Sequence, residues 1–198
     1  MMRQTVRKMI SRWVLLLVAP LLAACASPSV PDQYYLLSPM VQPVSPAPGE
    51  TTVIGVGPVT IPRYLDRSTI VTRSAANRPE VNSGYRWAEP LGENINRVLM
   101  DNLDRTGVAA RLEVFPWNSR DMVEWQVVVD IDRFERQADG NVNLTARWKL
   151  VHFQSGEIVT AAKYDKVSTP VDQTLDNTVI AMSSLLADLT AEIAARIP

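Results

Sequence analysis

An alternating pattern of apolar and polar side chains between residues 125 and 166 constrains the fold of this chain more than any other feature. The pattern runs through Trp125–Arg136, returns in Val142–Leu150 after an Asp139–Gly140 turn signal, and is followed by a third strand-like segment, Ile158–Lys166. Successive side chains of a strand point to opposite faces of a sheet. The pattern therefore predicts an antiparallel three-stranded meander with one face in the core and one face in water.

Two helices are also predicted. The first spans Leu91–Arg105, where apolar residues recur at the helical period and Gly107 follows as a stop. The second spans Pro170–Ile197, and Thr169–Asp172 resembles a capping box in which Asp replaces the usual Glu or Gln. Its apolar stripe consists of Leu175, Val179, Met182, Leu186, Leu189 and Ile193. The stripe packs on a sheet or on another copy of the chain, and its short length favours the sheet.

Shorter strand-like segments occupy the rest of the chain, namely Tyr34–Leu37, Thr52–Val59, Ile70–Arg73, Tyr85–Trp87 and Ala109–Phe115. Tyr85–Trp87 is a candidate hairpin partner of Ile70–Arg73, and residues 77–84 are rich in turn formers. Four prolines between residues 39 and 48 predict an extended linker or a long surface loop. Together these elements predict a single α+β domain over residues 34–198, an antiparallel sheet with two main helices packed on it.

The first 25 residues have the pattern of an export signal. Four cations precede an apolar run of about a dozen residues that ends at Ala24, which is shorter than the roughly 20 residues of a membrane-spanning helix. Leu22–Cys25 resembles a bacterial lipobox, in which the peptidase cleaves before a cysteine that then carries acyl chains. Cys25 is the only cysteine of the chain. We therefore expect residues 1–24 to be a lipoprotein signal peptide and Cys25 to be lipidated; an ordinary secretory signal is the alternative.

The mature chain is expected to begin with a lipidated tether over residues 25–33. Residues 1–24 hold four of the 20 Lys and Arg residues and none of the 21 Asp and Glu residues, so the remainder carries a net charge of −5. A basic groove is the footprint of nucleic-acid binding, and this charge argues against one. It also argues against polybasic membrane binding, so we expect membrane contact through the lipid. No cofactor is expected beyond the diacylglycerol and N-acyl chains on Cys25.

The candidate catalytic residues do not form a recognisable site. His152 is the only histidine and has no partner that the sequence identifies, which favours a structural role and argues against the common types of metal site. Asp130 and Asp132 share one strand face, as an acid pair would, but Arg147 and Lys149 on the next strand can pair with them. Motifs for hydrolase elbows, phosphate loops and dinucleotide binding are missing from the sequence. Binding is therefore favoured over catalysis.

Two tracts resemble the family of ABC-type transport auxiliary lipoproteins, which includes the paraquat-inducible protein C lipoproteins. The first tract is Val56–Arg67, followed by Ile70–Arg73. The second is Arg86–Leu91, a tryptophan-proline-leucine turn that leads into a helix. Tyr34–Leu37, soon after Cys25, also fits the family. The resemblance covers nearly all of residues 25–198, and the order and spacing of the tracts are more specific than any one of them.

The resemblance implies a non-enzymatic, periplasm-facing lipoprotein of a mammalian-cell-entry (Mce) type system that moves phospholipids or similar lipids between membranes. Its expected partners are an Mce-domain tunnel protein and the associated inner-membrane transporter components, and further copies of the chain in a homo-oligomer are a third candidate. It would dock or stabilise the tunnel end and support membrane integrity. Ala26 and Ser27 follow Cys25 without an inner-membrane retention Asp, which favours the outer membrane. Alternatives are a lipoprotein regulator of cell-wall synthesis and a lipid-tethered periplasmic hydrolase.

The loop that follows the strand-like segment Thr52–Val59 is the candidate partner-binding site. We call it the signature loop, because it lies in the first tract that resembles the family. Pro58 and Pro62 would stiffen it and display Ile61, Tyr64 and Leu65, and a rigid apolar loop loses little conformational freedom on binding. The alternative is that Tyr64 and Leu65 cap the core. Trp87 is expected in the core, because it directly precedes a helix N-terminus.

Overall fold

The computed structural model describes residues 31–45, 51–117 and 123–198. Residues 32–198 form one compact unit, and every element described below belongs to it. The expected signal peptide, the Leu22–Cys25 lipobox and the tether up to residue 30 lie outside the described residues.

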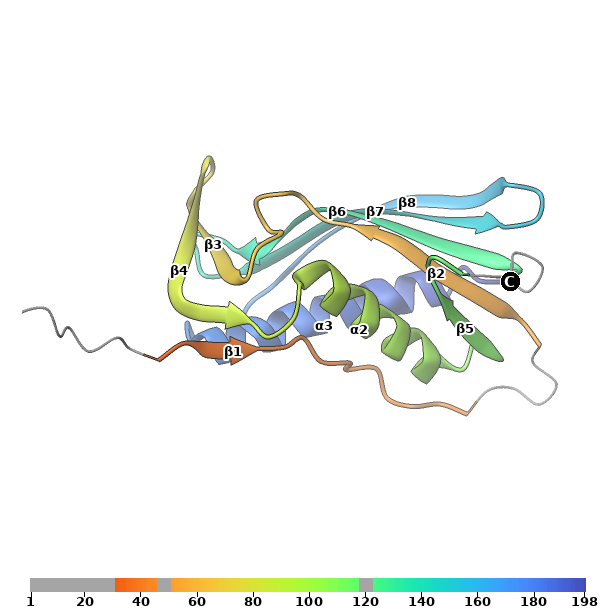
Figure 1. The fold of residues 1–198 in the computed structure, drawn as a ribbon, viewed down its shortest axis with the longest axis horizontal. Coiled ribbons are helices and arrows are strands. Elements are labelled where there is room, and N and C mark those ends of the chain that lie inside the picture. The colour runs from red at the N-terminus through yellow and green to blue at the C-terminus, as the bar shows by residue number, and fades with distance from the viewer. Residues whose placement is uncertain (1–30, 46–50, 118–122) are drawn as a thin grey trace, which may run out of the picture. The chain divides into compact units, whose positions relative to one another are not determined.

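The predicted meander is present and forms the long half of the sheet. It consists of β6 (Trp125–Arg136), β7 (Val142–His152) and β8 (Glu157–Ser168), paired antiparallel in that order. Val129 of β6 is opposite Trp148 of β7, which is opposite Ala162 of β8. The inward side chains are buried, because they pack under the two helices that cover this face of the sheet (Figure 1).

The rest of the sheet is mixed, so the prediction of an antiparallel sheet is only partly right. β2 (Val53–Thr60) pairs parallel with both β6 and β5 (Arg111–Val114), and β1 (Gln33–Tyr35) pairs parallel with β4 (Arg78–Trp87). β3 (Thr69–Ala75) pairs antiparallel with β4 and meets β6 in parallel at one residue pair. Side-chain alternation does not encode strand direction. The nearly continuous apolar run of β2 is nevertheless typical of a strand between parallel neighbours.

The hairpin of β3 and β4 is confirmed, but it is longer than predicted. Residues 78–84 belong to β4 and are not a separate turn. Most side chains of this stretch are exposed or only half-buried, so it lacks the alternation by which a half-buried strand is recognised in a sequence.

Both helices exist, and the second begins later than predicted. α2 (Leu91–Thr106) ends at Gly107, whose φ of 69° is the left-handed conformation that favours glycine. α3 (Leu175–Ala194) begins after Thr174, whose side chain accepts a hydrogen bond from the Asn177 backbone N–H. Thr169 instead donates its hydroxyl to Asn141, so it is not the cap. The whole apolar stripe of α3 is buried in the core, which confirms that it packs within the domain.

Residues 36–45, which we call the N-terminal strap, pack along the two helices. Asn94 Oδ1 accepts a hydrogen bond from the Leu37 N–H at 2.8 Å, and Asn102 Oδ1 accepts from the Met40 N–H at 2.9 Å. Ser183 of α3 accepts from the Ser38 N–H at 3.1 Å. The first part of the proline-rich stretch is therefore held against the domain by side chains that satisfy its backbone.

Candidate functional site

The signature loop between β2 and β3 is a compact turn. The N–H groups of Leu65 and Asp66 both donate to the Pro62 carbonyl, at 2.9 and 3.2 Å. Leu65 is only 2% exposed and belongs to the hydrophobic core. Ile61, Pro62 and Tyr64 are partly exposed. The sequence left two interpretations of this loop, a docking surface or a cap on the core. Leu65 is therefore a core residue, whereas the other three side chains reach the surface.

Tyr64 is fixed by a buried carboxylate. Its hydroxyl donates to Glu135 Oε2 at 2.8 Å, and Arg73 Nε donates to Glu135 Oε1 at 2.9 Å. The Glu135 side chain is fully buried, and Arg73 is 11% exposed. Gln137 and the Phe134 N–H supply two further donors. We call Tyr64, Arg73 and Glu135 the Tyr64 clamp, and it ties the signature loop to β3 and β6.

The electrostatics of the clamp favour a neutral tyrosine. Burial raises the pKa of Tyr64 to about 12, and the hydrogen bond to Glu135 acts in the same direction. The Arg73 guanidinium also lies 5.6 Å from the centre of the Tyr64 ring, in a cation–π arrangement. Sequence reasoning missed the clamp because its three residues lie on different elements. The one local signal is a charged residue, Glu135, beside the apolar Phe134 at the end of β6.

The two tracts that resemble the family, Val56–Arg67 and Arg86–Leu91, lie next to each other in the structure. The Trp87 N–H donates to the Ser68 carbonyl at 2.8 Å, and Trp87 is buried in the core as predicted. A surface hollow of about 350 Å³ lies at this junction. It is lined by Asp66, Arg67, Ser68, Trp87, Ala88, Glu89 and Pro90. The loop after β2 and the turn before α2 therefore form one continuous surface.

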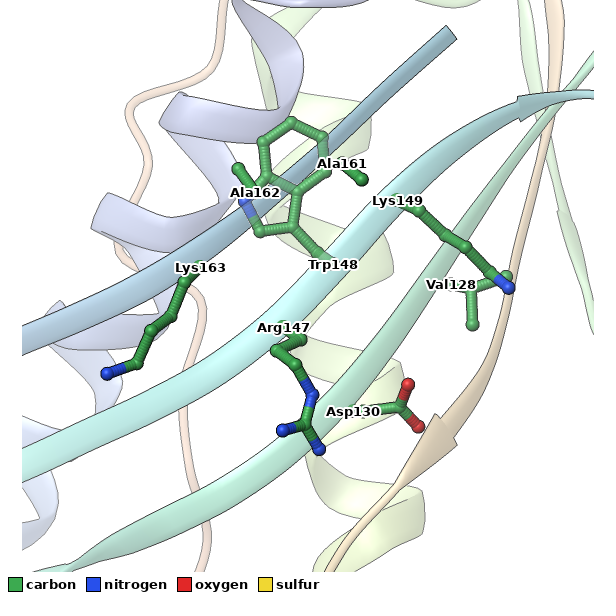
Figure 2. A pocket seen from close by; sticks show the side chains of 8 residues that line it. All are labelled: Val128, Asp130, Arg147, Trp148, Lys149, Ala161, Ala162 and Lys163. Carbon is green, nitrogen blue, oxygen red and sulfur yellow. The ribbon is translucent and has the colours of Figure 1, made fainter. Parts of the chain in front are cut away.

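A second hollow lies on the outer face of the meander, away from the helices (Figure 2). Its volume is about 390 Å³, and it is lined by Val128, Asp130, Arg147, Trp148, Lys149, Ala161, Ala162 and Lys163. Asp132 forms an ion pair with Arg147 at 2.9 Å, the cross-strand pairing that the sequence predicted. Asp130 accepts a hydrogen bond from the Thr60 hydroxyl. The two aspartates thus have separate structural partners.

His152 has a local partner. Its Nδ1 lies 2.9 Å from the Ser155 hydroxyl oxygen, and its ring stands edge-on to Trp125 at 5.0 Å between centres. Both contacts fit the structural role that the sequence favoured. Among residues 31–45, 51–117 and 123–198, His, Cys, Asp and Glu form no cluster of three or more that could hold a metal ion.

Residues 35–194 match the family described as the ABC-type transport auxiliary lipoprotein component. The chain belongs to this family. The family is one of transport components and not of enzymes, as the sequence predicted. The chain is also 27% identical, over 143 residues, to the intermembrane transport lipoprotein PqiC of Escherichia coli strain K12. This match covers 71% of the chain and 74% of PqiC.

Two crystal structures share the fold of this transport auxiliary lipoprotein. One is of an uncharacterized protein, with a TM-score of 0.69 and 21% identity, and the match covers 85% of this chain and 100% of that one. The other is of a protein from Xanthomonas campestris, with a TM-score of 0.65 and 18% identity over 81% of this chain and 92% of that one. Within the described part of this chain, neither helix is long and apolar enough to cross a membrane.

Proposed function

We propose that this protein is an outer-membrane lipoprotein subunit of an Mce-type system that moves lipids between membranes. The family match over residues 35–194 carries this proposal, and the similarity to an intermembrane transport lipoprotein supports it. The protein docks or stabilises the end of an Mce-domain tunnel protein, which in turn works with inner-membrane transporter components. This activity is binding and positioning, and it supports the integrity of the membrane.

The signature loop is the docking surface in this proposal. Ile61, Pro62 and Tyr64 are its partly exposed apolar and aromatic side chains, and Arg63 beside them is exposed. The Tyr64 clamp and the buried Leu65 fix the loop before a partner arrives. A loop that is already rigid loses little conformational entropy on binding. Leu65 thus supports the surface from below without touching the partner.

Lipid on Cys25 supplies the membrane attachment. Each buried methylene of an acyl chain stabilises membrane residence by about 0.8 kcal/mol, and two or more chains are needed for stable anchoring. A cysteine that carries diacylglycerol and an N-acyl chain such as palmitate meets that requirement.

Co-purification from the membranes of the source organism tests the proposal. The wild-type lipoprotein is expected to capture an Mce-domain protein, and Ile61→Ser is expected to weaken that capture while the melting temperature stays close to wild type. Val159→Ser, at an exposed position on β8, is the matched control and should capture normally. Capture of a cell-wall synthesis enzyme by the wild type, without any Mce-domain protein, would overturn the proposal.

A further inference from the structure

The position of the expected lipid anchor limits which surface can reach the membrane. Cys25 and Asp32 are seven residues apart, so their Cα atoms are separated by at most about 25 Å of extended chain. Asp32 is held in the domain by an ion pair with Arg86 of β4. If Cys25 is acylated, as the proposed function requires, the end of the domain that carries β1 must remain close to the lipid.

An exposed apolar surface lies at this end. β1 and the two residues after it alternate, with Tyr35 and Leu37 turned toward the core and Tyr34 and Leu36 turned outward. Tyr34 is 65% exposed and Leu36 is 46% exposed. Figure 1 shows β1 and β4 at one end of the domain and β5 at the other.

Helix α3 adds a third apolar side chain beside this segment. Ser183 accepts a hydrogen bond from the backbone N–H of Ser38, so its side of α3 faces the N-terminal strap. Ile180 is three residues earlier, which places it on the same side of the helix. Ile180 is 53% exposed, although the apolar stripe of α3 is buried in the core. Tyr34, Leu36 and Ile180 form what we call the anchor-side patch.

We propose that the anchor-side patch rests on the lipid surface at the level of the headgroups. The short tether is the main reason, because it brings this end of the domain to the bilayer that holds the acyl chains. The chemistry agrees, since tyrosine is enriched at membrane interfaces, where its ring is in an apolar region and its hydroxyl in a wet one. Among the neighbouring charges, Asp32 and Arg86 neutralise each other. Asp176 of α3, four residues before Ile180, lies near the Tyr35 hydroxyl and adds a negative charge. The contact therefore depends on apolar burial and does not require anionic lipid.

Single-cysteine fluorescence tests this orientation in the full-length lipoprotein reconstituted into vesicles of zwitterionic phospholipid. An acylated Cys25 has no free thiol, so an environment-sensitive maleimide dye attaches only at an introduced cysteine. The test positions are Tyr34→Cys, Leu36→Cys and Ile180→Cys. The control is Val114→Cys on β5, which is similarly exposed at 50%. Lipids with a nitroxide in the headgroup region then serve as quenchers.

If the patch rests on lipid, the emission of the dye at the three patch positions is shifted to the blue and strongly quenched by the nitroxide. The dye at position 114 shows neither effect. Vesicle flotation and the lack of dye on the parent protein report separately whether Cys25 is anchored. A protein that floats but shows equal, weak quenching at all four positions would overturn the patch while leaving the anchor intact. Protection from a water-soluble quencher without nitroxide quenching would show that a protein surface covers the patch, which also overturns lipid contact. Failure to float would refute the anchor and both proposals with it.

Discussion

Replacing Tyr64 by phenylalanine tests whether the clamp fixes the signature loop. The substitution removes one hydrogen bond to a fully buried carboxylate and leaves the ring in place. Hydrogen bonds to charged groups contribute about 1.5–3 kcal/mol, so we expect the free energy of unfolding to fall by that amount. For a chain of this size, each kcal/mol lowers the melting temperature by about 2–4 °C.

The companion substitution Glu135→Gln should lower the free energy of unfolding by more than Tyr64→Phe does. It leaves the Arg73 guanidinium, which is 11% exposed, without its carboxylate. Breaking a buried ion pair by removing one partner typically costs about 3–5 kcal/mol. In the double variant Tyr64→Phe/Glu135→Gln, the tyrosine substitution should cost much less than it does alone, because its charged acceptor is already gone.

Urea unfolding at pH 7 gives the free energy of unfolding of the wild type, the two single variants and the double variant. The same measurement at alkaline pH provides a second test. The pKa of Tyr64 is raised to about 12 from its ordinary value of 10.0, so the folded state holds this proton more tightly than the unfolded state. The resulting stability is fully present below pH 10 and is lost as the pH rises from 10 to 12. Wild type should therefore lose more stability than Tyr64→Phe over this interval. Equal pH profiles, together with additive costs in the double variant, would refute the clamp.

Four further substitutions test the packing and the start of α3. Leu65→Ala should cost about 2–5 kcal/mol in urea unfolding, since it empties a buried site, and a change below about 0.5 kcal/mol would mean that Leu65 is a surface residue. Thr174→Ala should lower the free energy of unfolding by about 1 kcal/mol and Thr169→Ala by less, because only Thr174 caps α3. A larger loss for Thr169→Ala would mean that the helix begins at Pro170, as the sequence predicted. Leu186→Asp should abolish the cooperative thermal transition, because it places an unpaired charge in the core, whereas a folded monomer would assign the stripe of α3 to oligomer contacts.

Features set by local pattern could be predicted from the sequence, and features set by distant contacts could not. The meander and α2 follow from alternation, helical periodicity and the Gly107 stop, all of which lie within short windows. The parallel pairing of β2 with β6 joins segments about 70 residues apart, and nothing in either segment specifies the direction of its neighbour. The late start of α3 is similar, because residues 169–174 offer two threonines with capping potential and tertiary contacts decide between them.

In the candidate site, too, local features could be predicted from the sequence and distant contacts could not. The signature loop was located from its prolines and apolar residues, and Trp87 was correctly placed in the core. The sequence could not show that Leu65 is buried and Ile61 partly exposed, because both are apolar residues of one turn. Nor could it pair Tyr64 with Glu135, since the two are 71 positions apart.

In the proposed arrangement, the N-terminal strap links the lipid anchor on Cys25 to the orientation of the domain. If only β2 onward were folded, 28 residues would separate Cys25 from Val53, a reach of about 100 Å. Asn94 and Asn102, both fully buried on α2, accept backbone N–H groups of the strap and hold it down. The first residue held by the domain is then Asp32, seven positions after Cys25, a reach of about 25 Å. The pairing of β1 with β4, the Asp32–Arg86 ion pair and the two asparagines behind them therefore act together. In the proposed arrangement these contacts set which end of the domain lies near the acyl chains, because without them the anchor would attach the domain without orienting it.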